Sequence, residues 1–463
     1  MPDLTPQDTL PPRRGFSPPR LVAKLGLFDA TMVVMGGIVG AGIFINPYVV
    51  AREVHTSALI LGAWVLGGLI ALVGAFIYAE LAARLPAVGG QYAYLREAFH
   101  PALAFLYGWV LLLVIQTGGM AAVAVTFARY FLQVTHLRIG DAGIAAAALA
   151  LLSIINCLGV RPGSAVQSAL MVLKIVAILA LVATGLWFIY RSPSSTSSHL
   201  AGPILDRGVS PGLLAAVGGA MVPVLFSYGG WQTSNFIAAE IREPQKNLPR
   251  ALLLGVAGVI VLYLAVNFVC VGVLGPGGLA AAGTPASSVM LVAVGGRGAQ
   301  FIALGIMVSA LGFLSQSILT APRVYFAMAS DGLFFRAVAW LDPRSRVPVV
   351  AILLQAACAI VIVMMGKYEQ ILSYVVSMDF LFFGLTALSL FVFRRGDSRS
   401  PENPSFRVPG HPLTTILFIA ASWAVVLNTI FRFPRNTAIG FAILLAGLPV
   451  YFLWQRNQGR HSE

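Results

Sequence analysis

Apolar stretches long enough to cross a lipid bilayer recur along the whole chain. A transmembrane helix needs about 20 mainly apolar residues, and 58% of the 463 residues are apolar. Only 10% are charged, whereas a soluble domain carries about 25%. The pattern predicts an all-α polytopic membrane protein with about twelve transmembrane helices, at roughly residues 27–50, 57–83, 101–134, 143–160, 165–190, 211–240, 249–275, 289–329, 347–365, 369–393, 412–431 and 437–455.

The basic residues predict the orientation of these helices, because cytoplasmic loops hold the excess of Lys and Arg. With the loops on alternating sides, the side of the N-terminus receives 20 of the 30 basic residues and the opposite side nine, while Lys174 lies inside a span. We therefore expect a multi-pass protein of the plasma membrane, of the bacterial inner-membrane type, with both termini cytoplasmic. Residues 1–24 are expected to be a disordered basic tail, and residues 456–463 a C-terminal tail.

Other classes of protein find no support in the residues. The net charge of +13 is spread along the chain instead of forming one basic face, so we expect no nucleic-acid partner. The three cysteines lie in or beside apolar runs, without the spacing of a zinc site. No catalytic motif such as HExxH or a Walker A lysine occurs. We expect no enzyme activity, no metal and no cofactor.

Two of the predicted helices contain interruptions. Residues 36–44 (GGIVGAGIF) place four glycines near the middle of the first span, and residues 223–231 (PVLFSYGGW) interrupt the sixth. Each glycine costs about 1 kcal/mol in a helix interior relative to alanine. Close packing of small residues at Gly36 and Gly40, which fit GxxxG, is the alternative interpretation of the first segment alone.

The two interruptions occupy equivalent positions in a repeated architecture. A transport core at residues 25–393 would consist of two inverted five-helix repeats, at about 27–190 and 211–393, with helices eleven and twelve in 394–455. Paired interruptions at corresponding positions predict the substrate site of a transporter with inverted repeats. Broken backbone is tolerated at membrane depth where it lines a cavity.

The free backbone groups at these interruptions suit an amino acid. The helix segment that begins near Ile43 directs its positive end and unpaired amides toward the first interruption, which favours a carboxylate. Carbonyl groups released around Val39 and Phe226 would favour an ammonium group. An α-amino acid carries both groups.

Three segments carry a resemblance to a known family. GGIVGAGIF at 36–44, FSYGGW at 226–231 followed by EIREPQKNLPRA, and RVYFAMASDGLF at 323–334 resemble the L-type amino acid transporters of the amino acid–polyamine–organocation superfamily. The resemblance implies the five-plus-five fold, and an aromatic at Phe226 that closes over the substrate. It also implies substrate contacts through the backbone of Val39, Gly40, Ala41, Gly42, Phe226, Ser227 and Gly229.

Lys174 lies close to the membrane midplane, about 13.5 Å into the fifth span at 1.5 Å per residue. A lysine at that depth costs about 2.5 to 3.5 kcal/mol, so it requires a polar partner or cavity. A structural ion pair or carbonyl bond is one interpretation. The family resemblance implies another, in which the ammonium replaces the sodium ion of sodium-coupled relatives.

Asp379 in the tenth span is the other deep charge. It is expected to be paired, to be protonated, or to face the substrate cavity, and the residues do not decide among these. Trp231 flanks the second interruption, and we expect it to contribute to the gate with Phe226. The charged residues from Glu240 to Arg250, and similarly Glu80 and Arg323, are expected either in a solvated loop or in an inner gate.

These observations predict a sodium-independent secondary transporter of neutral L-amino acids that works as an exchanger by alternating access. A proton-coupled or cationic amino acid or polyamine carrier that uses Asp379 is the alternative. A membrane sensor or channel with the same fold is the alternative from another class. Membrane lipid is an expected partner; a disulfide-linked heavy chain is not, because the loop at 135–140 has no cysteine.

Overall fold

The described part of the chain is helical throughout. The computed structural model describes residues 21–137, 139–205, 208, 210–365, 368–396 and 404–459. Within these residues no strand forms, and one isolated parallel bridge joins Leu25 to Ile241. The prediction of an all-α protein is confirmed. The predicted tail at 1–24 lies outside the described residues up to residue 20, and within the predicted tail at 456–463 only 456–459 are described, as the end of the last helix.

The described helices have the following order along the chain. The first part of the chain forms α1 (Leu27–Ile38), α2 (Gly42–Val54), α3 (Ser57–Arg84), α4 (Gln91–Ala98), α5 (Pro101–Val110), the π-helix η2 (Leu111–Ile115), α6 (Gln116–Thr135), α7 (Asp141–Cys157), α8 (Val160–Arg191) and α9 (Pro193–Leu200). The second part forms α10 (Pro211–Tyr228), the 3₁₀ helix η3 (Trp231–Glu240), α11 (Pro244–Ala281), α12 (Pro285–Val294), α13 (Gly296–Thr320), α14 (Pro322–Ser330), the 3₁₀ helix η4 (Arg336–Ala339), α15 (Val349–Met364), α16 (Tyr368–Gly396), α17 (Leu413–Arg432) and α18 (Pro434–Gly459).

Each of the twelve predicted spans falls on these helices. Among the described residues, ten helical segments are long and apolar enough to cross a membrane, and α7 and α15 are shorter apolar helices of 17 and 16 residues. The predicted span 289–329 is interrupted at Gly295, where φ is +79°, whereas Gly296–Ser330 runs as one apolar span. The count of twelve crossings and the inverted repeat stay predictions.

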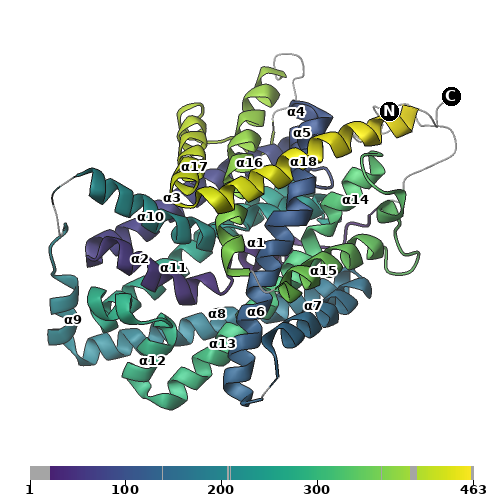
Figure 1. Cartoon of the computed structure of the whole chain (residues 1–463). Helices are drawn as coiled ribbons and strands as arrows, with labels where there is room; N and C mark the ends of the chain where they lie inside the picture. The colour runs from purple at the N-terminus through teal and green to yellow at the C-terminus, as the bar shows by residue number, and fades with distance from the viewer. Residues whose placement is uncertain are drawn as a thin grey trace.

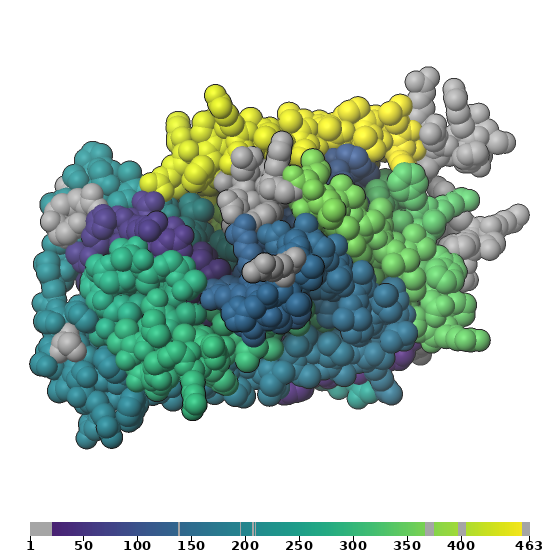
Figure 2. Space-filling view, turned by 60° about the horizontal axis from the view of Figure 1, so that its bottom comes forward, coloured from purple at the N-terminus to yellow at the C-terminus, as the bar shows by residue number. Residues whose placement is uncertain are grey.

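The bundle has two recognisable ends. Figure 1 shows α9 at the left of the view, while α18 runs across the top and ends at the right. We call the end where Leu25 pairs with Ile241 the N-terminal side. The opposite side holds α9 and the end of α2, because the Ser57 hydroxyl, just beyond α2, donates to the His199 carbonyl at 2.6 Å. Figure 2 shows the purple α2 segment against the green region of α11 and α12.

Small residues allow the central helices to approach closely. A Cβ atom on Gly255 of α11 would lie 2.6 Å from Val34 of α1, and one on Gly185 of α8 would lie 2.0 Å from Val269 of α11. Glycine therefore sets the spacing between α11 and both neighbours. Such contacts are typical of membrane helices, which associate through close packing because lipid removes the hydrophobic drive.

Charged residues on the N-terminal side are buried and paired, so the expected solvated loop is wrong for the central ones. The Arg323 Nε donates to Glu240 at 2.6 Å, and neither side chain is exposed. The ends of the sixth and eighth predicted spans are therefore joined by an ion pair inside the protein. Arg242, Glu243 and Lys246 conform to the solvated interpretation, since they lie at the surface or nearly so.

A second buried carboxylate joins three chain segments. Glu80, at the end of α3, accepts from Arg84 at 2.7 Å, from Arg394 of α16 at 2.6 Å and from the Val408 backbone amide at 2.7 Å. Such a carboxylate uses nearly all of its acceptor capacity. We call Glu80 with these three donors the Glu80 cluster.

Candidate functional site

The first interruption is a short extended segment between two helices. α1 ends at Ile38, Val39 adopts an extended conformation (φ −74°, ψ 93°), and α2 begins at Gly42. No side chain caps the start of α2. The Phe44 amide donates to the Ala41 carbonyl at 3.1 Å, whereas the amides at the very start of α2 lack helical acceptors, as at any helix N-terminus.

The second interruption differs in form from the prediction. Pro223 lies inside α10, which continues to Tyr228, and the break falls at Gly229 and Gly230. Gly230 has a φ of +99°, which glycine adopts without strain. Beyond it the chain resumes as the 3₁₀ helix η3.

The two interruptions touch each other through glycine backbone. A Cβ atom on Gly230 would lie 2.1 Å from the Gly37 carbonyl oxygen, and one on Gly37 would lie 2.5 Å from the Gly230 oxygen. No side chain separates the chain breaks at this point. Any movement of one break must therefore move the other.

A cavity of about 180 Å³ lies between the two interruptions. A single water needs roughly 10–15 Å³ on the same measure, so the space accepts a small organic molecule. Gly40, Ala41 and Gly42 line it from the first break, and Phe226, Ser227 and Gly229 from the second. Helices α6, α13 and α16 complete the wall. The polar side chains around the whole cavity are those of Asn46, Gln116, Thr126, Gln232, Thr233, Gln316, Ser317 and Asp379.

Val39 and Ile43, which the sequence placed with these residues, do not line the cavity. The Ile43 side chain is fully buried. The Val39 carbonyl is directed toward α8, where the Lys174 Nζ donates to it at 2.5 Å and lies 3.5 Å from the Gly36 oxygen. Lys174 itself is fully buried. The structure therefore brings the lysine to the back of the first interruption.

Other helices bind three more carbonyls of the breaks. The Ser309 hydroxyl of α13 donates to Gly40 at 3.0 Å. The Tyr263 hydroxyl of α11 lies 3.0 Å from the Ile38 oxygen and 3.2 Å from the Ser227 oxygen. Since carbonyl oxygens only accept, one phenolic proton is shared between the two breaks.

Ser227 is held from the opposite helix. The Asn46 amide of α2 donates to the Ser227 hydroxyl at 2.7 Å and to the Pro223 carbonyl at 3.0 Å. The Ser227 hydroxyl in turn donates to Pro223 at 2.8 Å. Asn46 thus ties α2 to α10 at the edge of the cavity.

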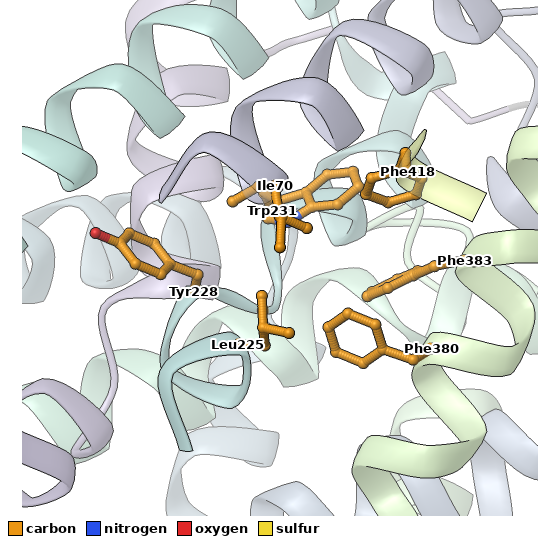
Figure 3. A pocket seen from close by; sticks show the side chains of 9 residues that line it. Ile70, Leu225, Tyr228, Trp231, Phe380, Phe383 and Phe418 are labelled. Carbon is orange, nitrogen blue, oxygen red and sulfur yellow. The ribbon is translucent and has the colours of Figure 1, made fainter. Parts of the chain in front are cut away.

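The two aromatic residues predicted for the gate lie in different surroundings. Phe226 is half-buried and lines the cavity. Trp231 lies instead in an apolar pocket of only about 10 Å³, stacked on Phe383 at 5.4 Å between centroids. Figure 3 shows its indole beside Phe418 and Phe383, while the Tyr228 ring points away from them. This pocket has space for about one water, so it accepts no substrate.

Asp379 lies on α16 and faces the cavity. Its Oδ1 atom is buried and has no hydrogen-bond partner. Among the described ion pairs none includes Asp379. The paired interpretation of this residue therefore has no support in the structure.

Sequence reasoning missed several residues of the site, namely Asn46, Gln116, Tyr263, Ser309 and Gln316. Two of them could have been found from the sequence. Gln116 and Gln316 are amides within otherwise apolar spans, where polar groups require partners. Tyr263 and Ser309 are too ordinary in a membrane helix to stand out.

A cluster of three polar side chains on the N-terminal side links the short helix α4 to the end of α14. Arg96 forms an ion pair with Asp331, and the Tyr92 hydroxyl donates to Asp331 at 2.8 Å. Burial, together with Asp331, raises the pKa of Tyr92 above its usual value. Burial alone would lower the pKa of the Arg96 guanidinium, but the carboxylates of Asp331 and Glu97 raise that pKa above its usual value. Both donors therefore keep their protons at physiological pH.

Within the described ranges, no group of three or more His, Cys, Asp or Glu residues could hold a metal ion. The described cysteines, Cys157, Cys270 and Cys358, are free thiols.

The fold and the cavity together define a multi-pass membrane permease. The model of the amino acid permease family matches residues 25–454, and the chain belongs to this family.

Named relatives cover nearly the whole chain. It is 29% identical over 436 residues to the serine/threonine exchanger of Bacillus subtilis (strain 168). The alignment covers 93% of this chain and 97% of that protein. It is 29% identical to the mouse large neutral amino acids transporter small subunit 2, over 94% of this chain and 82% of the relative. The human b(0,+)-type amino acid transporter 1 is 27% identical, over 94% and 88%.

Proposed function

We propose that the protein is a sodium-independent exchanger of neutral L-amino acids, which it carries across the plasma membrane by alternating access. The observation that carries this proposal is the cavity shared by two interrupted helices, which presents the uncapped start of α2 to a small molecule. Membership of the amino acid permease family and the names of the relatives support the substrate class.

In this proposal the substrate carboxylate binds at the amides of Gly40, Ala41 and Gly42. These residues line the cavity, and a helix N-terminus favours an anion through its free N–H groups and its dipole. A side chain on Gly42 would meet the Ser227 hydroxyl at 2.9 Å. Glycine therefore keeps the space that a carboxylate needs.

The α-ammonium group binds at the second interruption. The Val39 carbonyl is engaged by Lys174 behind the cavity, so we assign the ammonium to the carbonyl groups of Phe226, Ser227 and Gly229. The Phe226 and Ser227 oxygens each accept one internal bond. A carbonyl oxygen has two lone pairs, which leaves one for the substrate.

Lys174 accounts for the proposed sodium independence. Its ammonium occupies a position between α8 and the first interruption, where it donates to backbone carbonyls of the kind that coordinate a bound cation. The fixed charge therefore makes a dissociable cation unnecessary at this point.

Alternating access requires that the cavity open to one side at a time. The half-exposed lining residues Ile45, Asn46 and Thr126 lie in the helix halves that lead away from the N-terminal side. We assign that side to the cytoplasm from the excess of basic residues, so this conformation faces outward. Phe226 is the proposed outer gate, and Trp231 supports α16 from behind the cavity.

Exchange in proteoliposomes tests the proposal. Vesicles that contain the purified protein are preloaded with unlabelled L-leucine, and uptake of labelled leucine is measured with external sodium or with choline. We expect uptake that requires internal amino acid and is the same in both buffers. Uptake without dependence on internal amino acid would indicate a channel. A sensor would bind leucine without uptake, and a requirement for sodium would overturn the role of Lys174.

Phe226→Ala tests the gate in the same vesicles. The variant should fold and bind leucine but exchange it more slowly, because the aromatic ring seals the occluded state. Wild-type exchange by this variant would remove Phe226 from the gate.

A further inference from the structure

The charge of the cavity is set by one residue. Of the described residues that line it, Asp379 alone is ionisable, since every other polar lining group is an amide, a hydroxyl or backbone. An ionised Asp379 gives the cavity a formal charge of −1 before any substrate enters. A wall built only for neutral side chains has no need of this charge.

The protein offers this carboxylate no cation among its described residues. Oδ1 is buried without a hydrogen-bond partner, and Lys174 is directed to the carbonyls of Gly36 and Val39. Tyr78 and Tyr107, which interact electrostatically with Asp379 from other helices, carry no positive charge. An unpaired carboxylate at membrane depth is costly unless a cation joins it.

We infer that Asp379 forms a side-chain subsite for a second ammonium group, so that the exchanger carries diamino acids such as lysine as well as neutral amino acids. The inference rests on the proposed function, because the α-amino and α-carboxyl groups must bind at the two interruptions. The added ammonium then forms a charge-assisted hydrogen bond with Asp379 in a space that excludes most water. Val376 and Phe380, one turn or less away on α16, supply an apolar wall for the methylene chain.

The matched substrates are L-lysine and L-norleucine, which share a straight four-carbon chain and differ by the terminal ammonium. Uptake of each is measured into proteoliposomes preloaded with norleucine, for the wild type and for Asp379→Asn. We expect the wild type to carry both, and the lysine-to-norleucine ratio to fall about tenfold or more in the variant, since a hydrogen bond to a charged group is lost. Asp141→Asn removes an equal charge at an exposed site outside the cavity, and should leave the ratio unchanged.

Two results would overturn the inference. One is a wild type that exchanges norleucine but refuses lysine. The other is an Asp379→Asn variant that loses lysine and norleucine uptake in equal proportion, which would place the α-ammonium group at Asp379. Failure of the wild type to exchange norleucine would instead count against the proposed function.

A measurement on the unmodified protein covers the case in which the variant does not fold. Nε-acetyl-lysine keeps the chain and replaces the ammonium with a neutral amide. It should compete with labelled norleucine about tenfold less effectively than lysine does. Equal competition by the two compounds would overturn the subsite.

Discussion

The two helix interruptions differ in how their free backbone groups find hydrogen-bond partners. At the first, side chains from three other helices satisfy the free carbonyls: Lys174 at Val39, Ser309 at Gly40 and Tyr263 at Ile38. At the second, most bonds are local. The Gly229 amide donates to Phe226, the Gly230 amide donates to Gln232, and the Thr233 hydroxyl donates to Gly230.

This difference assigns separate roles to the two breaks. The first is held from outside, so its shape depends on how α8, α11 and α13 lie around it. The second is held mostly by its own sequence, with Asn46 of α2 and Tyr263 of α11 as contacts from other helices. The first break is therefore the one through which the surrounding helices influence substrate affinity, and variants at the two breaks should differ accordingly.

The largest effect is expected at the glycine contact that joins the breaks. In Gly230→Ala the new Cβ atom would lie 2.1 Å from the Gly37 oxygen, at a φ of +99°. Strain and overpacking together should cost about 2 to 5 kcal/mol, and exchange should be lost. Thermal unfolding and leucine exchange measure both effects. Gly119→Ala, which also faces the cavity but has no atom within 4 Å of the added Cβ, is the control. Equal behaviour of the two variants would refute the contact.

A smaller effect is expected when the external support of the first break is removed. Lys174→Met keeps an unbranched side chain, one atom shorter, but leaves the Val39 carbonyl without its donor. A buried polar group without a partner costs about 1 to 3 kcal/mol, which would shift the balance between inward and outward states about tenfold. Apparent leucine affinity, measured from each face of the membrane, should change unequally. Equal affinities and a wild-type rate would make the lysine structural only.

Tyr263→Phe sharpens the comparison, because this hydroxyl serves both breaks. Its loss should cost about 1 to 2 kcal/mol, and should reduce leucine binding severalfold by loosening the two breaks relative to each other. A double-mutant cycle with Ser309→Ala, measured by leucine-dependent thermal stabilisation, tests coupling through the first break. Strictly additive effects would show that Tyr263 acts on the second break alone.

The smallest effect is expected for Ser309→Ala alone. The Gly40 carbonyl would lose one neutral hydrogen bond, worth about 0.5 to 1.5 kcal/mol. Leucine affinity should weaken a few-fold while the maximal rate changes little. A loss as large as that of Lys174→Met would mean that the charge of the lysine adds nothing to its hydrogen bond.

The sequence located both interruptions, because four glycines in seven residues and a Gly-Gly pair are costly inside membrane helices. It could not locate the second break to the residue. Pro223 suggested an earlier position, but α10 continues through the proline to Tyr228.

The partners of the breaks were harder to foresee. Lys174 stood out because a lone charge in a long apolar span has few explanations. Tyr263 and Ser309 depend on which face α11 and α13 turn toward α1, and that rotation is set by packing among several helices. Glu240 and Arg323 lie 83 positions apart, so only the folded chain shows that they form a buried pair.

The Glu80 cluster has a consequence for biosynthesis. Arg84 follows Glu80 by four residues, so the first ion pair forms as soon as α3 is made. Arg394 is translated 314 residues after Glu80, which takes roughly 15 to 60 seconds at 5–20 residues per second. Throughout this interval the nascent chain holds a carboxylate at the end of α3 with only Arg84 to neutralise it. A chain that ends before residue 394 therefore keeps a Glu80 carboxylate with only one of its two arginine partners. This incomplete pairing distinguishes truncated products from the complete protein.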